Sequence, residues 1–314
     1  MYNTQVELAV IILNWNAAAD TVQCIRAVAA WQHLRPTIWV VDNGSTDGSA
    51  DIISRACPAV HLIRNATNLG FAGGNNRGIV ASLAVGNMPI LLLNNDALIE
   101  EQDVIRMLDT LREDDRIGFI GPLLFDADER GRLLAAGGKN PVCHHHSHIL
   151  RLTPGEPVRA VGYVPGTVLL GRAETFRTVG LLDENYFFSM EVADLCMRAR
   201  QSGYASAVDT RARAFHAVGR SSHLRDTLHV YYIIRNRFLF IRKFYAHRKI
   251  LFYGSWALYS LALCLKVQLS GKPAMARAVW FGLLDGLRGW FGGQNERVLS
   301  ACSGLPGRGC LARP

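Results

Sequence analysis

The chain has 314 residues, of which 49% are hydrophobic, and this composition excludes an extended disordered protein. Its length predicts one large domain with an appendage. The net charge of +8 favours an anionic partner, which could be a nucleotide, a phospholipid surface or a nucleic acid. The seven cysteines are odd in number and lack CxxC spacing, which favours free thiols in a reducing compartment. A strand-like run begins almost at the N-terminus, so we expect no signal peptide.

Apolar runs alternate with helix-like segments through the first hundred residues. Strands are predicted at residues 6–13, 37–41, 60–64 and 89–93, and helices at residues 17–31, 49–56 and 79–85. The last of these helices is opened by a glycine-rich stretch, residues 68–78. This alternation has the spacing of βαβ units, so it predicts an α/β fold whose sheet is doubly wound, mainly parallel and flanked by helices.

The stretch Leu91-Leu92-Leu93-Asn94-Asn95-Asp96 reads as a buried strand that ends in polar groups. A lone carboxylate beside two amides suits a hard divalent cation that bridges to substrate phosphates. We therefore interpret Asp96 as the carboxylate that holds a metal–diphosphate group. The alternative is an ordinary strand end followed by an Asn/Asp turn.

Two other predicted strands also end in polar residues. Asn14 and Asn16 follow the first strand, and Asp42, Asn43 and Ser45 follow the second. Because the carboxyl ends of parallel strands meet at one edge, these turns and the turn at residues 94–96 are expected to form a single nucleotide site. Asp42 would accept a hydrogen bond from a base or a ribose hydroxyl; its alternative role is an Asx-turn cap for the following helix.

The glycine-rich stretch supplies four further candidates for donor binding, Asn68, Gly70, Gly74 and Asn75. Glycines allow backbone amides to approach a diphosphate closely. The spacing is not a GxGxxG motif directly after the first strand, and no GxxxxGK[ST] loop is present. A dinucleotide-binding Rossmann fingerprint is therefore a poor match.

The next part of the chain is less regular. It predicts helices at residues 101–112 and 174–179, strands at residues 117–120 and 205–208, an apolar pattern at residues 161–170, and a long loop or small β-insertion at residues 126–157. That loop contains Cys143-His144-His145-His146-Ser147-His148. A zinc site is conceivable, but adjacent histidines without a separated partner pair favour a solvated loop.

A second group of ionisable residues begins at Glu191. Glu191 and Asp194 are three residues apart and would share one face of a helix, with a carboxylate at the helix start placed to act as a general base. The alternative is a cap together with an ion pair between Asp194 and Arg198. Further on, His216 is a candidate metal ligand or phosphate donor, although a lone histidine is more often a structural hydrogen bonder.

Together these residues resemble the family-2 inverting glycosyltransferases of the GT-A fold, close to the rhamnosyltransferase-like branch. The matching segments are residues 11–16, 40–49, 68–78, 91–96, 166–194 and 215–222. The resemblance implies a GT-A catalytic domain at residues 1–225, a nucleotide-diphosphate sugar as donor, Mg²⁺ or Mn²⁺, and a single displacement that inverts the anomeric centre.

The resemblance also implies roles for single residues. Asp42 would contact the nucleoside, and Asp96 would be the metal carboxylate of a DXD-type motif that here reads Asn-Asn-Asp. The family usually carries two acidic residues where this chain has Glu191-Val192, so the second acid is replaced by valine. The role of the base therefore passes to Glu191 first and to Asp194 second.

The pattern changes after residue 226, where a helical region is predicted to residue 300 and a loose tail at residues 301–314. Residues 250–265 are apolar and uncharged, short for a full membrane span, and flanked by basic residues. We expect an interfacial or re-entrant segment that places the protein peripherally on the cytoplasmic face of the cell membrane. The alternative is a helical pair, with residues 274–291, that packs on the catalytic domain or in a homodimer.

The expected function is therefore transfer of a sugar, such as rhamnose or another hexose, from a nucleotide donor to a glycan or lipid-linked acceptor, with no nucleic acid as partner. Two alternatives stay open. One is a catalytically weakened homologue that still binds nucleotide or glycan, motivated by Val192. The other is a nucleotidyltransferase on a similar sheet, which would release pyrophosphate.

Overall fold

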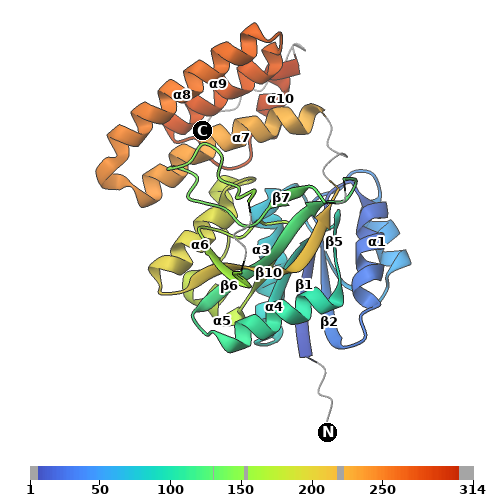
Figure 1. Cartoon of the computed structure of the whole chain (residues 1–314). Helices are drawn as coiled ribbons and strands as arrows, with labels where there is room; N and C mark the ends of the chain where they lie inside the picture. Colours follow the sequence, from blue (N-terminus) through green and yellow to red (C-terminus); the bar gives the residue numbers. More distant parts are fainter. Residues whose placement is uncertain (1–5, 130, 152–154, 218–222, 304–314) are drawn as a thin grey trace. The chain divides into compact units, whose positions relative to one another are not determined.

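The computed structural model of the chain describes residues 6–129, 131–151, 155–217 and 223–303 (Figure 1). It divides into two compact units. We call them the sheet unit, Met1–Glu184 with Glu191–Gly219, and the helical unit, Asn185–Met190 with Arg220–Pro314. The segment Asn185–Met190 thus belongs to the helical unit, although both of its neighbours along the chain belong to the sheet unit.

The sheet unit is built on one mixed sheet with the order β3-β2-β1-β4-β9-β6-β10-β5, to which β7 and β8 are added beside β6 and β10. The strands are β1 Val6–Asn14, β2 Leu34–Asp42, β3 His61–Arg64, β4 Ile90–Asn94, β5 Ala97–Ile99, β6 Ile117–Asp126, β7 Leu133–Ala135, β8 Val158–Val161, β9 Val168–Gly171 and β10 Ala205–His216. The pairings make β3, β2, β1, β4, β6 and β10 run in one direction, while β9, β5, β7 and β8 run in the other.

Helices cover both faces of this sheet (Figure 1). They are α1 Ala18–Ala29, α2 Ser49–Ala56, α3 Gly70–Val85, α4 Glu101–Glu113, α5 Ala173–Val179 and α6 Glu191–Gln201. Helices α1, α2 and α4 bury apolar residues in the main core cluster on one face, and α3, α5 and α6 pack on the other. The predicted α/β architecture with helices on both faces is confirmed.

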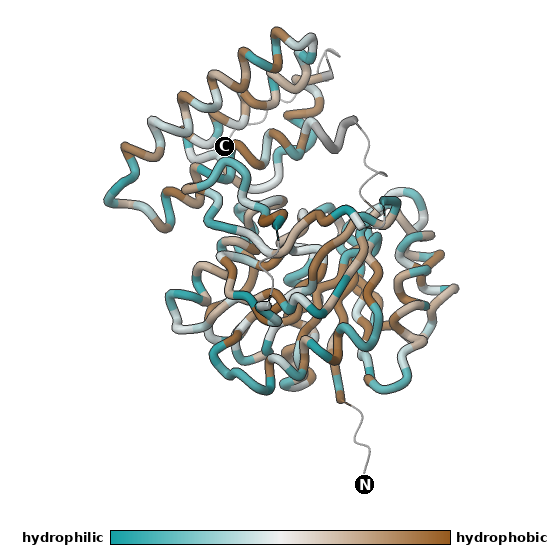
Figure 2. Tube along the Cα trace, in the orientation of Figure 1, coloured by the Kyte–Doolittle hydropathy of each residue, from teal (hydrophilic) through white to brown (hydrophobic). Residues whose placement is uncertain are grey.

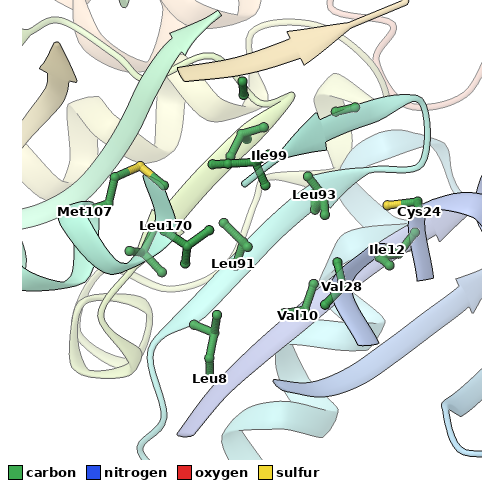
Figure 3. Close-up of a cluster of buried hydrophobic side chains, with 14 of the residues drawn as sticks. Leu8, Val10, Ile12, Cys24, Val28, Leu91, Leu93, Ile99, Met107 and Leu170 are labelled. Carbon is green, nitrogen blue, oxygen red and sulfur yellow. The ribbon is translucent and has the colours of Figure 1, made fainter. Parts of the chain in front are cut away.

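The main core forms because alternate residues of the central strands point to the same face. In Figure 3, Leu8, Val10 and Ile12 of β1 lie towards Cys24 and Val28 of α1, and all five are buried. Because β1 is covered on both faces, it reads as a continuous apolar run rather than an alternating one, which is typical of a buried parallel strand.

The glycine-rich stretch is itself helical, since α3 already begins at Gly70. A Cβ atom at Gly74 would lie 2.4 Å from Leu13 Cδ1, and one at Gly78 would lie 2.5 Å from Ile11 Cγ2. The two glycines therefore let the axis of α3 approach β1 closely. This packing role accounts for part of the glycine content that we assigned to diphosphate binding.

Several strands extend beyond their predicted bounds. β6 continues through Pro122 to Asp126, where β10 has a register shift between Asp209 and Arg213. A proline cannot donate to the ladder, so the irregularity of the partner strand falls where the missing N–H would otherwise leave a gap. β10 is one strand to His216, and β5 was not predicted.

The helical unit contains α7 His223–Phe244, α8 Lys249–Leu269, α9 Pro273–Arg288 and α10 Asn295–Ser303. Tyr231, Tyr232, Ala278 and Val298 form a buried cluster that joins α7, α9 and α10. Most of α10 lies in the region predicted to be helical, residues 226–300, and its last three residues fall in the segment expected to be a tail. The rest of that segment, residues 304–314, lies outside the described residues.

Candidate functional site

The polar ends of β1, β2 and β4 lie at one edge of the sheet. Asn14 and Asp42 are register partners at the last positions of β1 and β2, and Leu13 pairs with Asn94 at the end of β4. The three predicted turns therefore meet at one rim, as expected for parallel strands that end together.

A chain of hydrogen bonds joins these turns. Asn14 Nδ2 donates to Asp42 Oδ1 over 2.7 Å and to Ser45 Oγ over 3.1 Å. On the other side, Thr21 Oγ1 lies 2.7 Å from Asn14 Oδ1, and Asn95 Nδ2 donates to Thr21 Oγ1 over 2.9 Å. Thr21 is fully buried in α1 and links Asn14, at the end of β1, to the turn before Asp96. The sequence interpretation missed this role, because a threonine in a first helical turn usually reads as part of the helix start.

Asp42 is held by two donors and is 3% exposed. Besides the amide of Asn14, its second carboxylate oxygen accepts the backbone N–H of Ser45 over 3.1 Å. This contact closes a turn but does not cap the following helix, as the alternative had it, because α2 begins only at Ser49. It leaves lone pairs of both oxygens available. Asn16 has φ 52° and stabilises the same turn, since its Oδ1 accepts the N–H of Thr46 over 2.8 Å.

Asn43 joins the glycine-rich turn to the end of β2. Its Nδ2 donates to Asn68 Oδ1 and to the carbonyl of Gly70, both over 3.0 Å, and its Oδ1 accepts two further hydrogen bonds. Asn75 is 2% exposed and donates to the carbonyl of Phe71. These side chains hold the turn and the start of α3, and a direct contact of Asn43, Gly74 or Asn75 with a diphosphate stays a prediction.

Asp96 and His216 are brought together by β5. The antiparallel pairing of β5 with the end of β10 makes His216 the register partner of Ala97, and His216 Nε2 lies 3.1 Å from Asp96 Oδ1. Both side chains keep some exposure, 17% for His216 and 15% for Asp96. Both residues were predicted separately from the sequence. Their pairing was not, because β5 is only three residues long and leaves no periodic pattern.

This pair fits a divalent cation that binds phosphate. Two neighbouring ligands at about 2.1 Å from an octahedral ion lie about 3 Å apart, which matches the separation of these two atoms. Within the described part of the chain no three His, Cys, Asp or Glu side chains gather as a metal site. The donor set therefore suits an ion that completes its shell with phosphate oxygens and water.

The thiol nearest to this pair does not compete for the role. Burial, and to a smaller extent the Asp96 carboxylate, raises the pKa of Cys24 to about 12. Since the thiolate is the form that binds metals, Cys24 stays a protonated core residue.

Glu191 and Asp194 lie in different environments although they share the first turn of α6. Asp194 is fully buried and its Oδ1 accepts from Arg198 Nε over 2.7 Å, while the same guanidinium donates to the carbonyls of Val179 and Leu181. The ion pair that we kept as the alternative is therefore present, and Asp194 fixes the loop before η1, the 3₁₀ turn Glu184–Tyr186.

Glu191 is 6% exposed, and among the described residues its Oε2 has no hydrogen-bond partner. Burial raises the pKa of Glu191 to about 7, and the Asp194 carboxylate adds to this effect. A base is most effective when its pKa lies near the operating pH, so the Glu191 carboxylate is suited to accept a proton at neutral pH.

Packing contacts connect the first turn of α6 to the end of β4 at the rim. A Cβ atom at Gly166 would come within 3.1 Å of Val192 Cγ2 and 3.3 Å of Phe71. The next residue, Thr167, accepts the backbone N–H of Asn94 over 2.9 Å. Glu191 therefore starts a helix whose neighbours reach β4 directly before the Asn95-Asp96 turn.

Comparison with known proteins agrees with this arrangement. The family model described as glycosyl transferase family 2 matches residues 9–158. The matched segment identifies a family-2 glycosyltransferase domain in this chain. This glycosyltransferase is 28% identical over 233 residues to an N-acetylglucosaminyl-diphospho-decaprenol L-rhamnosyltransferase of Mycobacterium tuberculosis, an alignment that covers 65% of this chain and 74% of that protein. It is 27% identical over 274 residues to the dTDP-rhamnosyl transferase RfbF of Shigella flexneri, covering 81% and 87%.

Among solved structures, the glycosyltransferase is similar to mannosyltransferase PcManGT from Pyrobaculum calidifontis in complex with GDP-Man and Mn²⁺. The TM-score is 0.57 at 14% identity, and the match covers 92% of this chain and 89% of that one. A second neighbour is S. aureus TarS 1-349, with a TM-score of 0.54 at 15% identity and coverages of 94% and 83%. These matches show the fold, and the predicted GT-A type of α/β architecture is confirmed.

The histidine-rich segment of the glycosyltransferase is exposed. Cys143 and the three histidines that follow it are exposed, and Ser147 Oγ is 2.8 Å from the Tyr163 hydroxyl. Gly138 makes isolated bridges to His148 and Tyr163, both outside the named strands. The segment is thus part of an irregular insertion, in which β7 pairs with β6.

Proposed function

We propose that this glycosyltransferase moves a hexose, with rhamnose as the first candidate, from a nucleoside-diphosphate donor to a glycan or lipid-linked acceptor, with inversion at the anomeric carbon. The names of the relatives support both the sugar and a lipid-linked acceptor. The observation that carries the proposal is that the sheet unit holds two separate groups. One is the Asp96–His216 pair, for the phosphates, and the other is the Glu191 carboxylate, for the acceptor, whose Oε2 has no hydrogen-bond partner among the described residues.

In this proposal the residues of the rim bind the donor. Asp42 accepts from the nucleoside, because its carboxylate is already oriented by Asn14 and the N–H of Ser45. Asp96 and His216 would hold a Mg²⁺ or Mn²⁺ ion, which would supply positive charge opposite the leaving diphosphate. An imidazole ligand beside a carboxylate favours Mn²⁺ over Mg²⁺.

Glu191 supplies the proton chemistry. Its carboxylate accepts the proton of the acceptor hydroxyl while the hydroxyl oxygen forms a bond to the anomeric carbon. The bond from that carbon to the β-phosphate oxygen breaks, and the nucleoside diphosphate leaves with the electron pair. Attack from the face opposite the leaving group inverts the anomeric centre.

The direct experiment incubates the full chain with dTDP-rhamnose, GDP-mannose or a UDP-hexose, an N-acetylglucosaminyl-diphospho-polyprenol acceptor, and Mn²⁺. We expect release of nucleoside diphosphate and an extended acceptor with one of these donors, and loss of both with EDTA or with Asp96→Ala. Ser147→Ala, in the insertion, is the matched control and should retain transfer. Transfer that continues both with EDTA and with Asp96→Ala would refute the metal assignment.

A weakened homologue is the second candidate, because Val192 stands where the family usually carries an acid. Val192 is 4% exposed and packs beside Gly166 and Phe71. If the valine has abolished catalysis, Val192→Asp should restore transfer. If Glu191 is a working base, Val192→Asp should instead lower transfer at pH 7, because a second buried carboxylate raises the pKa of Glu191 further.

We also propose that the helical unit docks on an anionic membrane surface on the cytoplasmic side. Residues Ala246–Leu269 consist of a 3₁₀ turn, Ala246–Arg248, followed directly by α8. This helical stretch reaches a mean hydropathy of 1.5 and is long and apolar enough to cross a membrane by length and composition. Figure 2 shows hydrophobic positions along its whole length. One side packs on α9 through buried Trp256 and Ser260, and the other exposes large apolar residues: Ile250, Leu251, Leu258, Leu261, Leu265 and Leu269.

Basic residues stand beside this exposed apolar side. Arg242, Lys243, Arg248, Lys266 and Lys272 are all exposed in the helical unit. Apolar side chains flanked by cations are the pattern of a helix that lies in the interface of an anionic bilayer. An interfacial position also leaves the packed side of α8 in contact with α9, as the structure has it.

Vesicle flotation tests this docking. We expect binding to vesicles that contain phosphatidylglycerol and weak binding to pure phosphatidylcholine. The double variant Leu258→Glu with Leu265→Glu should abolish binding, while Val85→Glu, an equally exposed apolar position in the sheet unit, should not. A homodimer that is dissolved by the double variant, with no change in flotation, would show that a second copy covers this side instead.

A further inference from the structure

The segment Asn185–Met190 enters the first turn of α6 in an unusual backbone conformation. Phe187, Ser189 and Met190 have φ of 62°, 69° and 73°. Side chains other than glycine rarely adopt this left-handed region, so such a conformation persists only where surrounding contacts hold it. The next residue in the chain is Glu191, the first residue of α6.

One side chain of α7 holds most of this segment. Asn236 is fully buried, and its Nδ2 donates to the carbonyls of Tyr186, Phe188 and Ser189 over 3.1, 2.8 and 2.7 Å. The two N–H groups of this amide thus serve three carbonyls, so one N–H is shared between two of them. The amide can reach all three only while the chain folds back in the left-handed turns. The hydrogen bond between the N–H of Phe188 and the carbonyl of Tyr186 closes the same turn.

Arg235 holds the start of the segment and orients Asn236. Its guanidinium is fully buried and donates to the carbonyls of Asn185 and Tyr186 over 3.1 and 2.9 Å, and to that of Gly292 over 2.5 Å. Its Nε donates to Asn236 Oδ1 over 2.9 Å, which fixes the amide with its nitrogen towards the segment. The guanidinium also lies 4.7 Å from the centre of the Tyr232 ring.

We propose that Arg235 and Asn236 are positioning residues for the transfer reaction: they hold Asn185–Met190 in its left-handed conformation and thereby fix the first turn of α6, which carries Glu191. The inference rests on the proposed role of Glu191 as the base. It gives the helical unit a part in catalysis that is separate from membrane docking. Arg235 and Asn236 act on Glu191 only through the peptide chain, since Met190 and Glu191 are bonded neighbours.

The test replaces the hydrogen-bond donor of Asn236 with an acceptor and keeps the shape of the side chain. Asn236→Asp places a carboxylate oxygen where Nδ2 faces three carbonyls, so the segment loses its bonds and is repelled. We expect kcat to fall roughly 10- to 100-fold, as for a catalytic group misplaced by about 1 Å. The KM for the donor should stay within about twofold, because the rim binds the donor. Arg235→Lys, which keeps the charge and loses the fork of donors, should act in the same direction.

Val279→Ala is the control. It removes two methyl groups from a fully buried position of α9 in the helical unit. It should lower the stability of the helical unit and leave kcat unchanged. An equal loss of kcat in Val279→Ala and Asn236→Asp would show that Asn236 acts only through stability and would overturn the proposal.

A second readout does not depend on transfer. The stability gained by Glu191→Gln between pH 5 and pH 8 reports how well Glu191 is shielded from water. We expect this gain to shrink in the Asn236→Asp background and to persist in the Val279→Ala background. If the parent protein transfers no sugar, the proposed function fails while this readout still decides the role of Asn236. An unchanged gain in Asn236→Asp, or normal kcat, overturns the inference even where transfer is intact. If Asn236→Asp does not fold, kcat and the stability gain of Glu191→Gln are measured in Arg235→Lys instead, with the same expected outcomes.

Discussion

Replacement of Glu191 by glutamine should stabilise the protein at alkaline pH while it removes the transfer activity. The carboxylate is 6% exposed, its Oε2 has no hydrogen-bond partner among the described residues, and its pKa is raised to about 7 from 4.5 in the unfolded chain. Because the folded state binds this proton more tightly than the unfolded state, its contribution to stability is fully present below pH 4.5. It is lost as the pH rises through about 7.

The magnitude follows from the two pKa values. A difference of about 2.5 units at about 1.4 kcal/mol per unit makes the ionised carboxylate cost about 3 kcal/mol at pH 8. At pH 5 the Glu191 carboxyl is protonated in most folded molecules, and the same linkage gives a cost of ionisation under about 1 kcal/mol. Glutamine carries no charge at either pH, so the stability of Glu191→Gln relative to the parent should grow by about 2.5 kcal/mol from pH 5 to pH 8.

Thermal unfolding of the full chain at pH 5 and pH 8 measures this difference. For a folded unit of this size the expected change in relative Tm is roughly 5–10 °C. Asp194→Asn serves as the contrast, because it breaks the ion pair with Arg198 and should destabilise the protein at both pH values. A relative Tm of Glu191→Gln that is independent of pH would refute the raised pKa. A transfer rate in the parent that does not rise through about pH 7 would refute the role of Glu191 as base.

Other substitutions test the rim. His216→Ala should weaken Mn²⁺ binding at least tenfold and narrow the preference for Mn²⁺ over Mg²⁺, as measured by titration calorimetry, whereas equal affinity would exclude His216 as a ligand. Thr21→Val removes a buried hydroxyl that bridges two amides and should cost about 1–3 kcal/mol in unfolding free energy and raise the donor KM. Gly74→Ala would bring a methyl group 2.4 Å from Leu13 and should cost about 1–3 kcal/mol by chemical denaturation, while Gly86→Ala, with open space around it, should cost less.

The sequence predicted the architecture of the sheet unit well because buried parallel strands leave a strong signal. β1 is a continuous apolar run, and α2 has the predicted bounds, Ser49–Ala56. The rim was predictable from the same signal, since polar residues directly after such strands must meet at one edge. The polar ends at Asn14, Asp42 and Asn94 were found in this way.

The missed features depend on contacts between residues far apart in the sequence. β5 is three residues long and is defined only by its pairing with β10, so the meeting of Asp96 and His216 could not be read from periodicity. Arg235 and Asn236 lie about fifty residues from the backbone carbonyls that they hold, within a stretch whose mixture of basic and aromatic residues reads equally well as a membrane-facing helix. In the structure both side chains are fully buried.

The valine in the acidic motif is consistent with a working base. The two carboxylates in this helical turn lie in different environments. Asp194 is paired with Arg198, whereas Glu191 lies buried next to Val192, and its Oε2 has no hydrogen-bond partner among the described residues. A second acid at position 192 would add a like charge to that burial and move the pKa of Glu191 above the neutral range. Burial, together with the Asp194 carboxylate, already raises the pKa of Glu191 to about 7. The apolar residue therefore leaves Glu191 able to exchange a proton near neutral pH, and its presence is no argument that the base has been lost.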